Sequence, residues 1–247
     1  MKESNYAEII DRNISEDTCK KFGVTVKMDS MGTITNHYYP YHDTQGAKIA
    51  TKTRYTKLKE FSIKGNTKDS GLFGQHLFSK NKYCIITEGE LDALSAYQMM
   101  LKGTYHTPVV SIKNGISSAV KDIKNSLEWL ENNFDNVIVN FDNDEHGIDG
   151  AMKVAELFSP GKCKIMHLPE GFKDASDCLT KNKIQIYNKT FWDAKVFAPD
   201  GIINANTLLD DVLKPITKSF VQYPFEGLNK ITYGLRPSEL VTFTAGS

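Results

Sequence analysis

The sequence predicts an α/β fold in which a mostly parallel sheet carries helices on both faces. Between residues 83 and 168, short apolar and β-branched runs alternate with stretches of helical spacing. Such runs are typical of strands buried on both faces, and the alternation favours parallel pairing because each crossover needs a connecting helix. The residue pattern changes before and after this region. We therefore also expect a small α+β subdomain before the sheet and a linker segment after it.

Residues 1–82 are expected to form the small subdomain. Residues 15–22 predict a helix with Ser15 as its N-cap. Residues 33–41 are rich in β-branched and aromatic side chains and predict a strand. A polar turn follows, so residues 47–53 are expected to return as the partner strand of a hairpin.

Residues 83–195 are expected to form the main domain. The expected strands are residues 83–87, 109–112, 137–141 and 163–168. The expected helices are residues 91–101, 117–132 and 149–158.

Residues 196–247 are expected to form a linker and the start of another domain. Pro199 and Gly201 break regular structure, and residues 207–219 read as an amphipathic helix. An apolar strand is expected at residues 240–244, immediately before the last residues of the sequence. Because a domain does not normally stop at a buried strand, we expect this part to be truncated.

The composition favours a globular protein of the cytosol. Hydrophobic residues make up 40% of the 247 residues and charged residues 24%. The sequence contains no run of about 18 apolar residues, so we expect no membrane span. The cysteines contain no C-x-x-C pair, so we expect reduced thiols and no zinc. They are Cys19, Cys84, Cys163 and Cys178.

Acidic residues follow three of the expected strands. Glu88 follows the first, Asp142 and Asp144 follow the third, and Asp174 lies after the fourth. Ligands of open α/β sheets bind at the carboxyl ends of the strands, so these carboxylates are expected to converge. Oxygen ligands without His or Cys favour a hard cation, Mg²⁺ or Mn²⁺. We therefore expect a site for in-line phosphoryl displacement.

Other polar residues near these strand ends have two interpretations. Glu90 and Asp92 either start the following helix or act as secondary acidic groups of the site. Asp177 is expected to be an N-cap. Asn114, in a tight turn after the second strand, either binds an anion through its loop or is an ordinary turn residue.

A basic segment precedes the main domain. Residues 46–82 contain nine basic and two acidic residues, an excess that suits phosphates, although a solvated basic face is the alternative. Nearby aromatic residues could stack on bases or simply pack in a strand. These are His37, Tyr38, Tyr39 and Tyr41. The nucleotide- or DNA-binding candidates are Lys52, Arg54, Lys57, Lys59, Lys64, Asn114 and Lys173.

Three motifs together resemble the TOPRIM fold of primases and topoisomerases. They are TEGELD at residues 87–92, FDNDE at residues 141–145 and KDA at residues 173–175. The resemblance implies a TOPRIM-type sheet in which Asp142 and Asp144 hold magnesium. It also implies that Glu88 is a general acid/base or a metal ligand.

With residues 13–19, 52–54 and 71–74, these motifs resemble the bifunctional primase–helicases of bacteriophages, which are related to Twinkle. The resemblance implies a DNA primase, a DNA-directed RNA polymerase that makes RNA primers during phage DNA replication in the host cytoplasm. The implied partners are single-stranded DNA template, ribonucleoside triphosphates and RNA primer. In the full-length protein the implied partners also include a hexameric helicase domain and a DNA polymerase. No membrane partner is implied.

The chain also departs from that family. Residues 225–247 resemble a strand entering a Walker A loop, but the G-K-[ST] end is missing, and we find no zinc module that would read the template. Two alternatives to primer synthesis stay open: a TOPRIM-type nuclease, or a catalytically inactive primase-like module of a replicative helicase.

Overall fold

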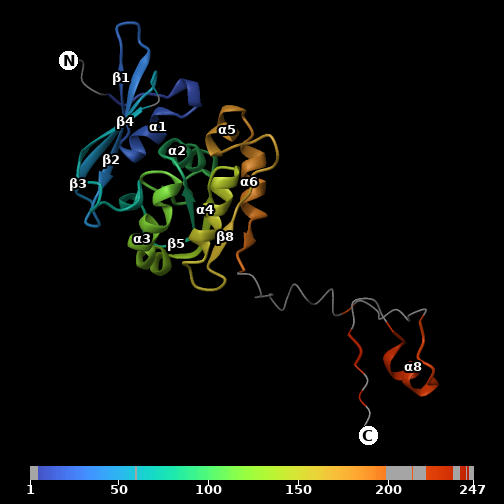
Figure 1. Ribbon diagram of the computed structural model, residues 1–247. Helices are drawn as coiled ribbons and strands as arrows, with labels where there is room; N and C mark the ends of the chain where they lie inside the picture. The colour runs from blue at the N-terminus through green and yellow to red at the C-terminus, as the bar shows by residue number, and fades with distance from the viewer. Residues whose placement is uncertain are drawn as a thin grey trace. The chain divides into compact units, whose positions relative to one another are not determined.

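The computed structural model describes residues 5–58, 60–198, 213, 221–235, 240–242 and 244. The chain divides into two compact units, Met1–Pro199 and Asp200–Ser247 (Figure 1). The first unit contains two sheets. The domain boundaries expected at residues 82/83 and 195/196 stay a prediction.

An antiparallel sheet and one helix form the N-terminal part of the first unit. The helix α1 (Glu16–Phe22) begins as predicted, because the Ser15 hydroxyl accepts a hydrogen bond from the backbone N–H of Thr18. The strands lie in the order β1-β2-β3-β4, and β2 and β3 form the predicted hairpin. The strands are β1 (Thr25–Met28), β2 (Ile34–His42), β3 (Lys48–Tyr55) and β4 (Glu60–Gly65).

The second sheet has five strands in the order β6-β5-β7-β8-β9. The first four are parallel, as predicted, and β9 adds an antiparallel edge. The strands are β5 (Asn81–Thr87), β6 (Val109–Ser111), β7 (Phe134–Asn140), β8 (Cys163–Ile165) and β9 (Lys195–Val196). The helices are α2 (Glu90–Met99), α3 (Ala119–Asn133), α4 (Glu145–Ala155), α5 (Ala175–Thr180) and α6 (Ile184–Trp192).

The strand order sets the helix layers. The chain passes from β5 through α2 to β6, then back across β5 through α3 to β7. Because such crossovers are right-handed, α2 covers one face and α3 and α4 the other. Accordingly α2 contacts α5 and α6, while α3 contacts α4. The direction of winding therefore reverses between β5 and β7, which is where open α/β sheets bind ligands.

Aromatic packing joins the antiparallel sheet to the α/β part. Phe22 of α1 stacks on Phe73 with ring centroids 5.5 Å apart and meets Tyr97 of α2 at 5.1 Å. Tyr39 of β2 also packs edge-on against Phe73. These buried contacts fix β3 and β4 relative to the ends of β5 and β7.

The N-caps of two helices differ from the prediction. The helix α4 begins four residues earlier than expected, because the Asp144 side chain accepts a hydrogen bond from the backbone N–H of Gly147 and caps it. Asp174, and not Asp177, is the N-cap of α5, since its Oδ1 accepts from the Asp177 N–H at 2.6 Å. Asp177 instead pairs with Lys181 at 2.8 Å.

The second unit contains one described helix, α8 (Glu226–Thr232). Its Asn229 side chain exchanges two hydrogen bonds with the backbone of Tyr223, each 2.7 Å long. The linker residues Pro199 and Gly201 and, apart from residue 213, the helix expected at 207–219 lie outside the described residues. Residues 240–242 and 244 are not in a strand, contrary to expectation. None of the described helices has the length and apolar character that crossing a bilayer requires.

Candidate active site

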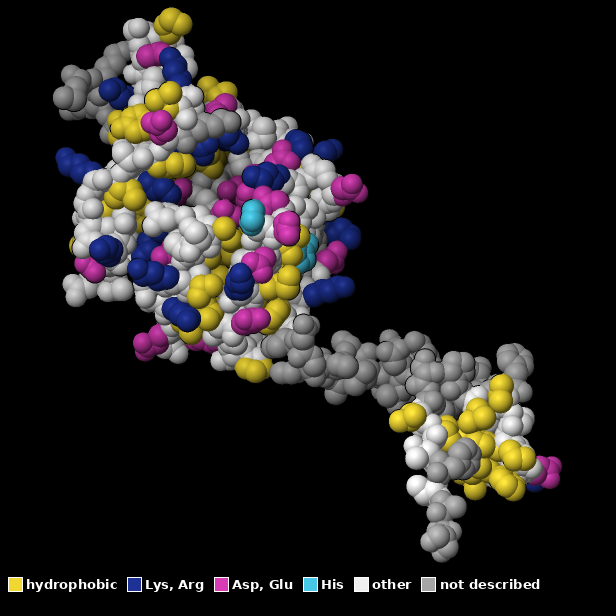
Figure 2. All heavy atoms as spheres, in the orientation of Figure 1, with side chains coloured by type: hydrophobic (Ala, Val, Ile, Leu, Met, Phe, Trp, Pro, Cys, Tyr) yellow, Lys and Arg dark blue, Asp and Glu magenta, His cyan; other side chains and the backbone are white. Residues whose placement is uncertain are grey.

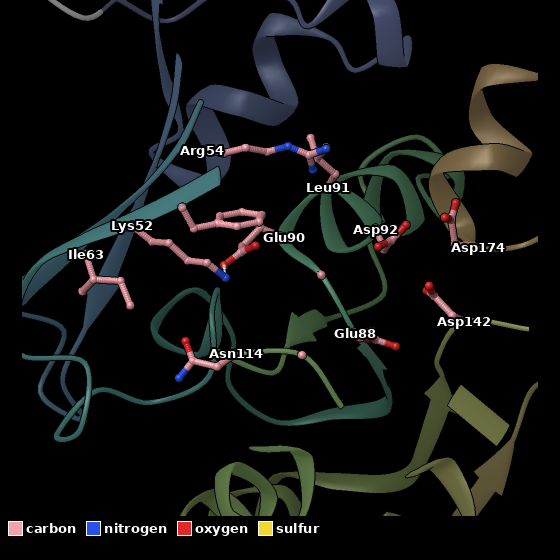
Figure 3. Close-up of a pocket in the computed structure, with 13 residues that line it drawn as sticks. Lys52, Arg54, Ile63, Glu88, Glu90, Leu91, Asp92, Asn114, Asp142 and Asp174 are labelled. Carbon is pink, nitrogen blue, oxygen red and sulfur yellow. Dashed lines mark ion pairs between the residues drawn. The ribbon is translucent and has the colours of Figure 1, made fainter. Parts of the chain in front are cut away.

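A cavity of about 580 Å³ opens between the antiparallel sheet and the carboxyl ends of the parallel strands (Figure 3). Its position matches the switch point between β5 and β7. On the surface, Asp and Glu side chains gather on one face beside Lys and Arg (Figure 2). The cavity is lined by Lys52, Arg54, Phe61, Ile63, Glu88, Gly89, Glu90, Leu91, Asp92, Asn114, Gly115, Asp142 and Asp174.

The parallel sheet supplies the acidic wall. Thr87 of β5 is level with Asn140 of β7, so Glu88 and Asp142 leave the sheet at the same edge. Asp92 follows in the first turn of α2, and Asp174 caps α5, a helix that contacts α2. The expected convergence of Glu88, Asp142 and Asp174 is therefore present in the folded chain (Figure 3).

The carboxylates of this wall disfavour one another's ionisation. Burial, followed by the nearby charges of Asp142 and Asp144, raises the pKa of Glu88. Burial and the charge of Asp174 raise the pKa of Asp92 well above its ordinary value. The repulsion between these carboxylates destabilises their ionised forms, and a bound cation would reduce it.

Asp144 lies at the margin of this group. Its side chain is exposed and caps α4, and it does not line the cavity, although its charge reaches Glu88. A side chain at Gly147 would overlap the backbone oxygen of Asp142, so this glycine lets the chain fold back from Asp142 into α4.

Lys173 is held against the acidic wall. Its Nζ lies 2.8 Å from Asp142 Oδ2, and this contact raises the pKa of Lys173. The backbone N–H of Asn143 donates to the Lys173 carbonyl at 2.7 Å, so the two loops are tied together. Lys173 is otherwise exposed and can turn toward an anion.

The antiparallel sheet supplies the cationic wall. Arg54 and Lys52 of β3 line the cavity, but Lys52 is buried and paired with Glu90 at 2.7 Å. Lys57 and Lys64 are exposed and lie outside the cavity lining, and Lys59 lies outside the described residues.

The remaining sequence candidates separate by burial. Asn114 is exposed and lines the cavity, whereas its neighbour Lys113 is buried and donates to the carbonyls of Thr67 and Ser70. Glu90 is buried as the partner of Lys52 and caps no backbone N–H of α2. The cluster of His37, Tyr38, Tyr39 and Tyr41 mainly packs in β2, with Tyr38 half-buried and the other three buried.

Sequence reasoning missed two apolar residues of the cavity, Phe61 and Ile63 of β4. Their side chains are 51% and 45% exposed. The alternating residues of Phe61-Ser62-Ile63-Lys64 are a strand signal, but the charged residues around them directed the interpretation toward a basic face.

The donor set fits a hard divalent cation bound together with a ligand. Within the part of the chain that the structure describes, no three acidic, His or Cys side chains form a ready cation cage. Magnesium commonly uses one or two carboxylates together with substrate phosphates and water. Asp142, with Glu88 or Asp174, meets that requirement.

Comparisons with known proteins agree with this architecture. Residues 4–65 match the family described as "Bacteriophage T7 DNA helicase/primase, N-terminal a+b fold", and residues 85–179 match "Toprim-like". The DNA helicase/primase of Enterobacteria phage T3 is 32% identical over 249 residues. That match covers 98% of this chain and 42% of the relative, so the chain spans less than half of the relative's length.

A crystal structure decides the family. The primase fragment of the bacteriophage T7 primase–helicase protein is 30% identical, with a TM-score of 0.68 over 76% of this chain and 74% of the fragment. The chain belongs to the bacteriophage primase–helicase family, with a TOPRIM-type primase fold. The predicted fold class and family are therefore confirmed.

Two further structures resemble this primase-family chain. One contains T7 lagging-strand DNA polymerase with primase domains of two subunits bound to an RNA/DNA hybrid and dTTP. Its match is 29% identical, with a TM-score of 0.69 over 78% of this chain and 94% of that chain. The E. coli primase catalytic core is 14% identical, with a TM-score of 0.59 over 82% of this chain and 76% of the core, a likeness of fold alone.

Proposed function

We propose that this chain makes short RNA primers on single-stranded DNA by template-directed nucleotidyl transfer. One observation carries the proposal: a single cavity has carboxylates on one wall and the Arg54 guanidinium on the other. Nucleotidyl transfer needs both, because a cation must be held while the negative charge of the phosphates is balanced. Membership of the primase–helicase family supports the same activity.

The acidic wall is proposed to hold the metal. Asp142, with Glu88 or Asp174 beside it and Asp144 at its margin, would hold Mg²⁺ or Mn²⁺, which when bound neutralises triphosphate charge. Burial, together with repulsion from neighbouring carboxylates, raises the pKa of Asp92 and of Asp174, and this supports the assignment. TOPRIM primases generally depend on a metal. We propose no zinc.

Glu88 is proposed to assist proton removal at the reacting end of the primer. The 3′ oxygen attacks the α-phosphorus, pyrophosphate leaves, and the 3′ hydroxyl proton must be accepted by a base. Burial raises the pKa of Glu88, and a base with a raised pKa accepts a proton more readily. Service as a cation ligand is the second role open to this carboxylate.

Cationic side chains are proposed to position the phosphates. Arg54 faces the cavity with donors suited to bidentate phosphate contacts. Lys173 can give up its ion pair with Asp142 and bind a triphosphate oxygen instead. Asn114 lies at the rim. Lys57 and Lys64, which are exposed outside the cavity lining, are proposed to follow the template backbone. Lys59 is proposed to do the same.

The wider assembly is also a proposal. The relatives are a helicase/primase and primase domains that interact with a DNA polymerase on an RNA/DNA hybrid. We propose that this chain acts in the same setting, with a hexameric helicase domain and a polymerase as partners and ribonucleoside triphosphates as substrates.

Primer synthesis tests the proposal. Labelled ribonucleotides are supplied with single-stranded DNA and Mg²⁺, and Asp142→Asn is compared with Asp149→Asn. Asp149 is an exposed aspartate of α4 that pairs with Lys153, so it is a matched control. We expect Asp149→Asn to keep wild-type synthesis and Asp142→Asn to lose on the order of 100-fold or more, because several kcal/mol of charge stabilisation are removed.

A parallel incubation of labelled DNA with Mg²⁺ but without nucleotides separates the alternatives. Cleavage that disappears in Asp142→Asn would instead identify a nuclease. Equal primer synthesis by both variants would remove the proposed role of Asp142.

A further inference from the structure

An apolar strip lies on the cationic wall of the cavity. It consists of Phe61 and Ile63 of β4, the edge strand of the antiparallel sheet. In the sheet register Phe61 faces Arg54 and Ile63 faces Lys52, and directly opposed residues of antiparallel strands share a face. The strip and the two cations therefore form one continuous surface, on which Ile63 and Lys52 appear together in Figure 3.

The phenylalanine ring is held by the cations beside it. Lys52 Nζ lies 4.8 Å and Arg54 Cζ 5.7 Å from the centre of the Phe61 ring, both within the range of cation–π attraction. Half of the side chain is nevertheless exposed, at 51%. A large aromatic surface thus lies open at a cavity that is otherwise lined mainly by charged groups.

The two kinds of surface match the two parts of a nucleotide. The carboxylates and cations suit phosphates and their cation, but they do not explain an exposed ring at the same cavity. A nucleobase has a flat apolar face that stacks on aromatic side chains, and cations beside the ring strengthen the contact. A volume of about 580 Å³ is in the usual range for small-molecule sites.

We propose that Phe61, flanked by Ile63, is a stacking platform for a nucleobase. The inference rests on the proposed function and deepens it, since it assigns recognition of the base to β4. The base belongs either to the incoming nucleotide or to the template strand, and the chemistry of stacking is the same for both. The buried aromatic rings of β2 do not take this role.

Equilibrium binding to the full chain tests the proposal in two arms. The first compares ATP with inorganic tripolyphosphate, and the second compares oligo(dT) with an abasic oligomer of equal length. Phe61→Leu removes the ring but keeps apolar volume, and Phe61→Trp keeps a ring. Tyr55→Leu is the control, because Tyr55 is an exposed aromatic of β3 one register position beyond Arg54, on the opposite face of the sheet.

We expect Phe61→Leu to weaken binding of a base-bearing ligand by about 5- to 100-fold, while binding of its base-free counterpart is unchanged. Phe61→Trp should bind as tightly as wild type, and Tyr55→Leu should have no effect. A loss confined to ATP assigns the incoming base, and a loss confined to oligo(dT) assigns the template base. Both outcomes support the platform.

Equal weakening of base-bearing and base-free ligands by Phe61→Leu would overturn the proposal, as would unchanged binding of all four. The outcome is separable from the proposed function. A wild-type chain that makes no primer but loses base-dependent binding in Phe61→Leu would refute primer synthesis and keep the platform. Normal primer synthesis by the wild-type chain, with binding unchanged in Phe61→Leu, would refute the platform and keep primer synthesis.

Discussion

Lys52 and Glu90 form a buried ion pair that joins the antiparallel sheet to helix α2. Lys52 Nζ lies 2.7 Å from Glu90 Oε1, and the same oxygen accepts a hydrogen bond from the Tyr41 hydroxyl at 2.6 Å. Lys52 also donates to the backbone carbonyl of Lys113 at 2.8 Å. Lys52 thus connects β3 to α2 and to the loop after β6, so it holds the cationic wall opposite the acidic wall.

Breaking this pair should destabilise the fold. Lys52→Ala leaves Glu90 buried without its cation, and the expected cost is about 3 kcal/mol of unfolding free energy. Denaturant unfolding measures it. Lys153→Ala, which removes an exposed pair with Asp149, should change stability by less than about 0.5 kcal/mol. Equal stability of the two variants would show that Lys52 does not hold the two sheets together.

Two substitutions of Asp144 should separate its capping role from its charge. Asn is as good an N-cap as Asp, so Asp144→Asn should keep the stability of α4 while it lowers primer synthesis. Asp144→Ala should lose synthesis and about 1 kcal/mol of stability as well. Denaturant unfolding and primer assays give both quantities. Normal synthesis by Asp144→Asn would restrict Asp144 to capping.

Acid should destabilise the antiparallel sheet through His37. Burial, followed by the charge of Arg54, lowers the pKa of His37 from 6.5 to about 4. Because the unfolded chain takes up the proton first, the stability that His37 contributes is complete above about pH 6.5. It is lost as the pH falls toward about 4, a change of roughly 2–3 kcal/mol.

Unfolding free energies between pH 7 and pH 4 test this expectation. His37→Asn should flatten the pH dependence in part, whereas His146→Asn, at an exposed position of α4, should leave it unaltered. An unchanged slope in His37→Asn would assign the acid sensitivity to other groups.

The acidic wall should cost stability when no cation is bound. The raised pKa of Asp92 means that its ionised form is disfavoured in the folded chain at neutral pH. Asp92→Asn removes that charge but keeps an oxygen that can accept from the Ser176 N–H, as Asp92 does at 3.1 Å. With EDTA present, we expect the variant to be more stable than wild type by more than about 0.5 kcal/mol.

Magnesium should reduce this difference, because a cation bound by the folded chain stabilises the full set of carboxylates. Thermal unfolding with EDTA and with excess Mg²⁺ gives the comparison. A variant that is less stable than wild type under both conditions would argue against carboxylate repulsion.

Local rules and strand topology predicted much of the fold and part of the site. Ser15 was predicted as a cap because capping depends on neighbours in sequence, and residues 83–87 and 137–141 were predicted as strands from apolar runs alone. That Glu88 and Asp142 meet follows from a general rule about the carboxyl ends of parallel strands. None of these inferences needs the packing of side chains.

What was missed depends on tertiary packing. Asp142 and Asp144 were both expected to hold the metal, and the additional role of Asp144 as the N-cap of α4 was not predicted. The pairing of Lys52, a candidate for phosphate binding, with Glu90 was not predicted, because it depends on the contact between β3 and α2. Phe61 was not a candidate, because its position at the cavity depends on the strand register that places it beside Arg54.

A double-mutant cycle tests the central claim, that carboxylates from separate loops act as one unit on one cation. Single-turnover primer extension is measured for wild type, Glu88→Gln, Asp142→Asn and the double variant. If the two carboxylates act together, the double variant should be about as slow as the slower single variant. Independent, multiplicative losses, or wild-type extension by Asp142→Asn, would contradict the account.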